Sequence, residues 1–266
     1  MTTERLDVRT GLGRETWWMT QRRLMAFVRQ PAYLLITLIQ PVVWLFLFGS
    51  LFESITDLPG FDTSSYLDYL VPGVVVTSSV ASNIWAGMTT LEEIDRGTLD
   101  RFLVTPMHRS AILNGTAVEQ GVSTSIQSLI IVLLGWVAGA SYPGGIVGVV
   151  VLVLFAVLLG TVFSGFSTAV GMLARERETI IGLSMITLLP LTFLSTVFMA
   201  EDLMPSWIRT VADYNPVNWA AVGAREALST SPDWASVFIR VALLAALGVV
   251  MMTLAVRSFR IYQKAV

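Results

Sequence analysis

Several residue types on which enzymes and metal sites depend are absent or nearly absent from this sequence. In 266 residues it has no cysteine, one histidine and one lysine. Without cysteine there can be no disulfide framework and no thiolate metal site. His108 is not accompanied by acidic residues at metal-ligand spacing, and no nucleophile-elbow pattern supplies a serine partner for it. These absences argue against hydrolase and metalloenzyme chemistry.

The scarcity of lysine also argues against a nucleotide-hydrolysing domain. A phosphate-binding loop of the P-loop type needs a lysine followed by serine or threonine, but Lys264 is followed by Ala265. We therefore expect no cofactor in this chain, and neither ATP nor Mg²⁺ bound by it.

Charged residues are scarce as well. They make up 14% of the chain, hydrophobic residues make up 54%, and the mean hydropathy is +0.70. Soluble domains carry about a quarter charged residues, so this deficit points to lipid as the solvent. The N-terminal segment has acidic residues and no apolar region ending in small residues, so it does not resemble a cleavable signal. The excess of arginine over lysine favours a high-GC bacterial genome. We expect the chain in the bacterial cytoplasmic membrane.

Long runs without charge predict six membrane spans of about 20 residues each. One run is too long for a single span, and the turn-rich segment 139–145 divides it. The predicted spans are Tyr33–Phe52, Tyr69–Leu91, Ile112–Ala138, Ile146–Ala174, Thr179–Ala200 and Val237–Val256. We therefore predict an all-α integral membrane protein, with residues 1–266 forming a single transmembrane domain.

The distribution of basic residues predicts the orientation of these spans, because cytoplasmic loops carry an excess of arginine and lysine. Fourteen of the seventeen basic residues fall on one side, in segments 1–32, 92–110, 175–178 and 257–266. The opposite loops hold only Arg209 and Arg225, against eight acids. Both termini are therefore predicted to be cytoplasmic.

Two further helical segments are predicted outside the spans. Residues 15–29 combine tryptophans and other apolar residues with arginines at helical spacing, which is typical of an amphipathic helix in the cytoplasmic interface. A solvated tail is the alternative. Residues 201–232 are too apolar for a solvated loop, and they predict an external hairpin of two short helices broken at Asn215-Pro216. This hairpin would rest at the outer interface or dip into it.

Few polar residues lie inside the predicted spans. Glu119 is the only acid there, Ser123 and Gln127 follow it at four-residue steps on one helix face, and Asn83 lies in the second span. A carboxylate facing lipid is costly, so this face is predicted to point towards protein or a wet pathway. One interpretation is an interfacial Glu119 bonded to a neighbouring helix, and the other is a substrate path that favours cationic amphiphiles. A channel or ion-coupled carrier would need more such groups.

The loop between the second and third predicted spans carries the most specific pattern. Residues 91–106 read LEEIDRGTLDRFLVTP. Mixed charge together with Leu99, Phe102 and Leu103 predicts a compact helix and turn that docks into another protein and ends at Pro106. A solvated connector, the alternative, would not need these three apolar residues.

This segment resembles the hallmark segment of type-2 ABC exporter permeases, and most closely that of the daunorubicin-resistance branch. Three more regions match in the same order, so the resemblance covers nearly the whole chain. They are Arg29–Pro31 with Pro41 and Phe48-Gly49, then Leu70–Gly73, and then Phe193–Arg225 with Asn215-Pro216. The chain departs from the pattern at 196–198, where many relatives place a glycine.

The resemblance implies the membrane subunit of an ATP-driven exporter. Two such subunits would pair above two separate P-loop ATPase subunits, and residues 92–106 would be the coupling helix. The residues implied to dock into the ATPase are Glu92, Glu93, Arg96, Gly97, Thr98 and Arg101. Implied substrates are hydrophobic drugs or lipids, with polysaccharide or glycolipid export as the alternative. A membrane enzyme or scaffold is the alternative from another class, and no binding of nucleic acid is expected.

Overall fold

The computed structural model describes residues 12–28, 31–52, 65–97 and 109–264, and these residues contain helices and no strand. The helices are α1 (Leu12–Val28), α2 (Pro31–Leu51), α3 (Tyr66–Asn83), α4 (Ala86–Asp95), α6 (Arg109–Val137), α7 (Gly145–Ala174), α8 (Arg177–Phe193), η2 (Glu201–Leu203), α9 (Ser206–Asp213), α10 (Pro216–Leu228) and α11 (Trp234–Lys264). The predicted all-α class is confirmed for this part of the chain.

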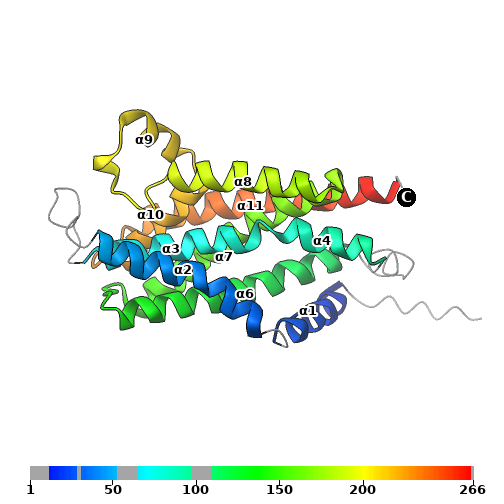
Figure 1. Ribbon diagram of the computed structural model, residues 1–266, viewed down its shortest axis with the longest axis horizontal. Coiled ribbons are helices and arrows are strands. Elements are labelled where there is room, and N and C mark those ends of the chain that lie inside the picture. Colours follow the sequence, from blue (N-terminus) through cyan, green and yellow to red (C-terminus); the bar gives the residue numbers. More distant parts are fainter. Residues whose placement is uncertain (1–11, 29–30, 53–64, 98–108, 265–266) are drawn as a thin grey trace, which may run out of the picture.

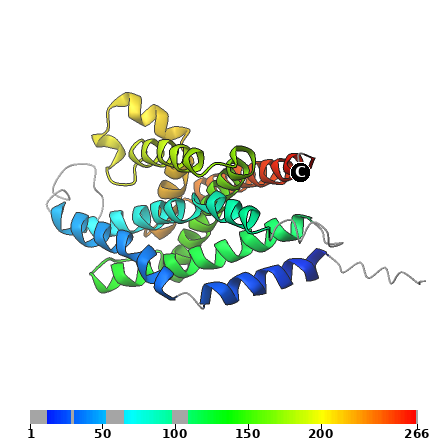
Figure 2. The same cartoon turned by 45° about the vertical axis from the view of Figure 1, so that its right-hand side comes forward.

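The long helices α2, α3, α6, α7, α8 and α11 run side by side as a bundle (Figure 1, Figure 2). The C-terminus, α1 and the end of α4 lie at one end, which we call the basic end; α9 lies at the other, the hairpin end (Figure 1). Helix α7 packs against α3, α4, α6, α10 and α11. Its fully buried Leu152, Phe155 and Leu159 therefore form the centre of the hydrophobic core.

Four helical segments among the described residues are long and apolar enough to cross a membrane. They are Tyr66–Asp95, Asn114–Val137, Gly145–Ala174 and Trp234–Phe259. The apolar part of α2, Ile36–Leu51, is shorter. Helix α8 has 17 residues, a length of roughly 26 Å, slightly less than a hydrocarbon core of about 30 Å. Length and composition thus support four of the six predicted spans. That α2 and α8 also cross the membrane stays a prediction.

The fifth predicted span ends earlier than the sequence suggested, at Phe193 instead of Ala200. The reason is a side chain from the hairpin end. The Nδ2 atom of Asn215 donates hydrogen bonds to the carbonyl oxygens of Leu191 at 2.7 Å and Leu194 at 2.8 Å. These bonds satisfy carbonyls that a continuing helix would have bonded itself, so the chain can leave the helix there.

The second predicted span is also not continuous. Its residues form α3 and α4, with an interruption at Ile84 and Trp85. This interruption was not predicted, and side chains of neighbouring helices contact it.

Helix α1 confirms the predicted N-terminal helix, but its packing was not predicted. It lies alongside the first turns of α6 (Figure 1, Figure 2). Met19 is buried there, and a Cβ atom added to Gly115 would lie 2.7 Å from the Met19 Cβ. Trp17 and Trp18 remain exposed on the outside of α1. Its location in the cytoplasmic interface stays a prediction.

The predicted hairpin helices are confirmed as α9 and α10, which are broken at Asn215-Pro216. The Oδ1 atom of Asn215 accepts a hydrogen bond from the Val217 N–H at 2.9 Å and so caps α10. Pro216 fits the first helical position, where its missing N–H costs nothing. The position of this hairpin at the outer membrane surface stays a prediction.

Candidate functional site

A groove with a volume of about 610 Å³ lies between α2, α3 and α8, and one residue of α6 forms part of its floor. This volume is within the range of pockets that bind small molecules. Its aromatic lining residues are Trp44, Trp85, Phe193 and Phe198, and its aliphatic ones include Ile36, Val74, Leu188 and Leu189. The groove therefore offers large apolar faces on several sides.

The polar lining of the groove is neutral. It consists of hydroxyl and amide side chains, from Thr37, Gln40, Thr77, Ser78, Ser82, Gln127 and Thr192. No charged side chain is among the described residues that line it. A full charge entering such a groove would lose hydration without gaining an opposite charge. The lining thus suits an apolar molecule with a few hydrogen-bonding groups.

Aromatic contacts fix the wall at the hairpin end of the groove. The rings of Trp44 and Phe198 stack with centroids 5.2 Å apart, and Trp44 also contacts Phe48 at 4.5 Å. The hydroxyl group of Tyr66 donates a hydrogen bond to the Phe198 carbonyl at 3.1 Å. The non-helical segment after α8 is thereby held in place, and Phe198 is presented to the groove.

Arg225 on α10 ties the same segment to the start of α3. Its guanidinium group donates to the carbonyl of Val197 at 2.8 Å, its Nε donates to the carbonyl of Tyr69 at 3.1 Å, and it lies 3.5 Å from the centroid of the Tyr69 ring. Burial of this group by surrounding protein lowers the pKa of Arg225. In the sequence this residue stood out as an exception to the charge distribution and as part of a region that resembles the permease family, and its packing role was missed.

Two of the predicted pathway residues lie at or near the groove floor. Gln127 lines the groove, accepts a hydrogen bond from Ser82 at 2.9 Å and donates one to the Thr37 carbonyl at 3.4 Å. It thereby joins α2, α3 and α6. Asn83 is buried beside the groove and donates to the hydroxyl oxygen of Thr124 at 2.9 Å. Its geometry is that of a contact between α3 and α6.

The other two predicted pathway residues are not among those that line the groove. Glu119 is partly buried on α6, whose first turns pack against α1. Ser123, one turn further along α6, is also partly buried. The structure therefore brings Gln127 to the groove and Glu119 towards α1, and a part for Glu119 in the pathway stays a prediction.

The acidic residues predicted to contact an ATPase subunit have basic partners within the chain. Glu93 contacts Arg23 at 2.7 Å and Arg22 at 3.8 Å, so it connects α4 with α1. Glu92 pairs with Arg96 at 3.4 Å, and both side chains are more than 40% exposed. Of this predicted set, Glu92, Arg96 and Gly97 thus remain available at the basic end, whereas Thr98 and Arg101 lie outside the described residues.

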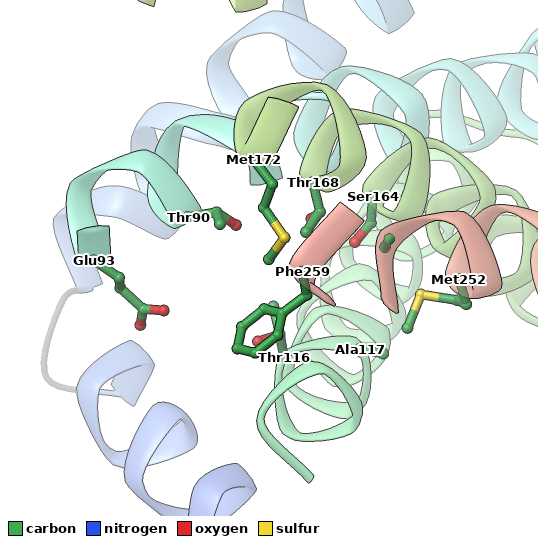
Figure 3. A pocket seen from close by; sticks show the side chains of 10 residues that line it. Thr90, Glu93, Thr116, Ala117, Ser164, Thr168, Met172, Met252 and Phe259 are labelled. Carbon is green, nitrogen blue, oxygen red and sulfur yellow. The ribbon is translucent and has the colours of Figure 1, made fainter. Parts of the chain in front are cut away.

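A second, small cavity lies at the basic end between α4, α6, α7 and α11 (Figure 3). Figure 3 shows Thr90 and Glu93 of α4 on one side of it, and the Phe259 ring is part of its lining. Its volume of about 20 Å³ is enough for roughly one water molecule. It is therefore too small for a substrate, and the groove is the candidate site.

Comparison with known proteins agrees with this architecture. Residues 14–229 match the family model for the ABC-2 type transporter. The chain is 31% identical to the daunorubicin resistance ABC transporter permease protein DrrB1 of Streptomyces coeruleorubidus, over 90% of this chain and 83% of that protein. It is 27% identical to the inner membrane transport permease YadH of Escherichia coli K12, over 71% of this chain and 74% of the relative. The probable doxorubicin resistance ABC transporter permease protein DrrC of Mycobacterium tuberculosis is 19% identical, over 79% and 75%.

The family match and the long apolar helices both indicate a membrane protein. The match covers the α1 to α10 region, including the groove and the end of α4. The helices that are apolar enough to cross a membrane make the chain a multi-pass membrane protein. It belongs to the ABC-2 type transporter family.

Proposed function

We propose that this chain is the permease subunit of an ATP-driven exporter that moves hydrophobic drugs or lipids out of the cytoplasm or inner leaflet. The observation that carries the proposal is the groove of about 610 Å³, with its aromatic walls and its uncharged lining. Relatives named for daunorubicin and doxorubicin resistance support a drug as the substrate. A flat apolar ring system would stack on the aromatic walls, and hydroxyl and amide groups such as Gln127 would meet its few polar atoms.

The proposed complex contains two kinds of partner. A separate P-loop ATPase subunit would bind ATP and Mg²⁺ and dock at the basic end, where Arg96 is 75% exposed. A second copy of the permease would face the groove, which is lined by α2, α3 and α8. The complex would lie in the bacterial cytoplasmic membrane, with six spans and both termini in the cytoplasm.

Transport in inside-out membrane vesicles tests this function and the coupling at once. Vesicles that hold the permease and its ATPase partner are expected to accumulate an uncharged fluorescent aromatic drug when ATP is added, and not with a non-hydrolysable analogue. Gly97 has φ +61, and no atom lies within 4 Å of an added Cβ. A β-branched residue is strained at this φ, by about 1–2 kcal/mol. If this strain opposes the conformation in which the turn docks on the ATPase, Gly97→Val is expected to lower ATP-dependent uptake roughly tenfold.

Gly97→Asn is the matched control, because asparagine adopts left-handed backbone conformations at little cost. It is expected to keep uptake and to co-purify with the ATPase as the parent chain does. Equal activity of the valine and parent chains would contradict the coupling role of this turn. ATP-dependent uptake of a lipid-linked glycan, with none of a drug or lipid, would favour the alternative substrate class.

The proposed topology has its own test. Reporter fusions after Val266 and within 92–110 are expected to be cytoplasmic, because these segments carry basic residues. Fusions within 53–66 and 201–235 are expected to be external. A cytoplasmic reporter in 201–235 would mean that α8 does not cross the membrane, and would reduce the number of spans.

A further inference from the structure

The interruption between α3 and α4 contains no proline. Proline, glycine–serine pairs and inserted side chains are the usual causes of a broken helix. Residues 81–86 read ASNIWA, and Gly87 follows in the first turn of α4. Glycine makes a break less costly, but it has no side chain to bond the backbone groups that the break frees, so groups on another helix must bond them.

The cause is a hydroxyl group from α7. The Oγ atom of Ser167 accepts a hydrogen bond from the Gly87 N–H at 2.9 Å and donates one to the Ile84 carbonyl. In a continuous helix Gly87 would bond to the carbonyl of Asn83, and the Ile84 carbonyl would accept from Met88. Instead Met88 donates to the Trp85 carbonyl at 2.9 Å. One serine hydroxyl thus bonds the two backbone groups, the Gly87 N–H and the Ile84 carbonyl, that lack their helical partners.

Close packing of α4 on α7 brings this hydroxyl within reach. A Cβ atom added to Gly171 would lie 2.7 Å from the Gly87 carbonyl oxygen, and one added to Gly87 would lie 2.3 Å from the Ser167 carbonyl oxygen. The two backbones therefore touch, and Ser167 stands one turn before Gly171. A second hydroxyl, that of Ser184 on α8, lies 3.4 Å from the Ile84 carbonyl.

The interruption lies between the groove and the basic end. Trp85, one of its two residues, is part of the groove lining. Helix α4 follows directly and carries Glu92 and Glu93 in its last turns, with Arg96 at its C-cap. Its 10 residues form an arm of about 15 Å. A change in backbone angle at Trp85 would therefore move the groove wall and the coupling residues together.

We propose that Ser167 is a positioning residue that holds the second span in its interrupted form. In doing so it sets the direction of α4 relative to the groove, and it links Trp85 to the residues at the basic end. This inference rests on the proposed function, since it concerns how the groove and the ATPase communicate. Without the Ser167 hydroxyl, the Gly87 N–H loses its acceptor, and the Ile84 carbonyl keeps only the longer bond from Ser184. A continuous helix would restore a backbone partner to both groups.

Distance measurements between two spin labels test this directly. The native chain has no cysteine, so Arg96→Cys and Leu173→Cys place labels only at the end of α4 and the end of α7. With Ser167→Ala added, the label distance is expected to shift by about 5 Å, the movement of a 15 Å arm through roughly 20°. Ser125→Ala is the matched control, because the Ser125 hydroxyl bonds to the Gly121 carbonyl of its own helix. It is expected to leave the distance unchanged.

Function and rescue complete the experiment. Ser167→Ala is expected to keep the ATPase subunit bound and to lose the substrate-stimulated part of ATP hydrolysis, at least fivefold. Ser167→Thr retains the hydroxyl and is expected to restore the parental distance. A parental distance in Ser167→Ala, or the same shift in the alanine and threonine variants, would overturn the inference. Absence of export by the parent chain would refute the proposed function, while the label distances would still decide the role of Ser167.

Discussion

Asn215→Ala is expected to lower the unfolding temperature of the detergent-purified chain by roughly 10 °C, which corresponds to a loss of about 4 kcal/mol at 2–4 °C per kcal/mol. The Asn215 side chain is only 3% exposed and makes three hydrogen bonds to backbone groups. Alanine would leave two partly buried carbonyl oxygens without this donor, at about 1–3 kcal/mol each. It would also remove the cap of α10, at about 1 kcal/mol.

Asn215→Asp separates these two contributions. Aspartate keeps an oxygen for the Val217 N–H, but it cannot donate to the carbonyls of Leu191 and Leu194. We therefore expect a loss almost as large as that of alanine, measured by the same thermal unfolding assay. Parental stability of the aspartate variant would show that the cap of α10 alone matters, and that the bonds to the end of α8 contribute nothing.

Gly223→Ala is expected to cost about 3 kcal/mol, or roughly 8 °C in unfolding temperature, as overpacking of a filled core does. A Cβ atom at Gly223 would lie 2.3 Å from Cζ of Phe155 and 2.9 Å from each of its Cε atoms. Phe155 is fully buried at the centre of the bundle, so its ring has no room to move away. Gly182→Ala is the control, because no atom lies within 4 Å of an added Cβ there.

A double mutant tests whether contact with the Phe155 ring causes the loss of stability in Gly223→Ala. Phe155→Leu removes the outer ring atoms and is expected to cost about 1–2 kcal/mol alone, because it leaves a cavity. Combined with Gly223→Ala, it is expected to give a chain more stable than Gly223→Ala alone, with a coupling energy above about 1 kcal/mol. Strictly additive losses would contradict direct contact between these two positions.

The features of the fold that the sequence predicted correctly are those with a local cause. The turn residues at 139–145 correspond to the end of α6 at Val137 and the start of α7 at Gly145. Asn215-Pro216 separates α9 from α10 for similar reasons, a cap and a proline at the first helical position. In both places neighbouring residues decide the backbone conformation, so the sequence alone is informative.

The features that were wrong or missed depend on contacts between distant segments. Ser167 interrupts the second span, Asn215 ends α8 early, and Gly115 accepts α1. Each contact joins residues at least twenty positions apart, so no local sequence pattern predicts it. A hydrophobic run shows that a segment is apolar, but it does not show which side chain from another helix will replace a backbone bond.

The candidate site also depends on contacts that the sequence alone does not predict. Helical spacing correctly placed Glu119, Ser123 and Gln127 in one row along α6. The neighbours of α6 change along its length: α1 lies beside its first turns, and α2 and α3 lie beside Gln127. The same row of residues therefore lies near α1 at its Glu119 end and lines the groove at Gln127. Periodicity defines a face, and only the packed structure defines what covers it.

The contact of α1 with α6 has a consequence for synthesis of the chain. Met19 packs on Gly115, a residue translated 96 positions later. At about 5–20 residues per second, α1 leaves the ribosome roughly 5–20 s before its partner exists. During that interval its exposed tryptophans and arginines have the membrane surface as their available apolar and anionic environment. If α1 lies in the cytoplasmic interface as predicted, the nascent chain would rest on the bilayer by its first helix before the bundle is complete.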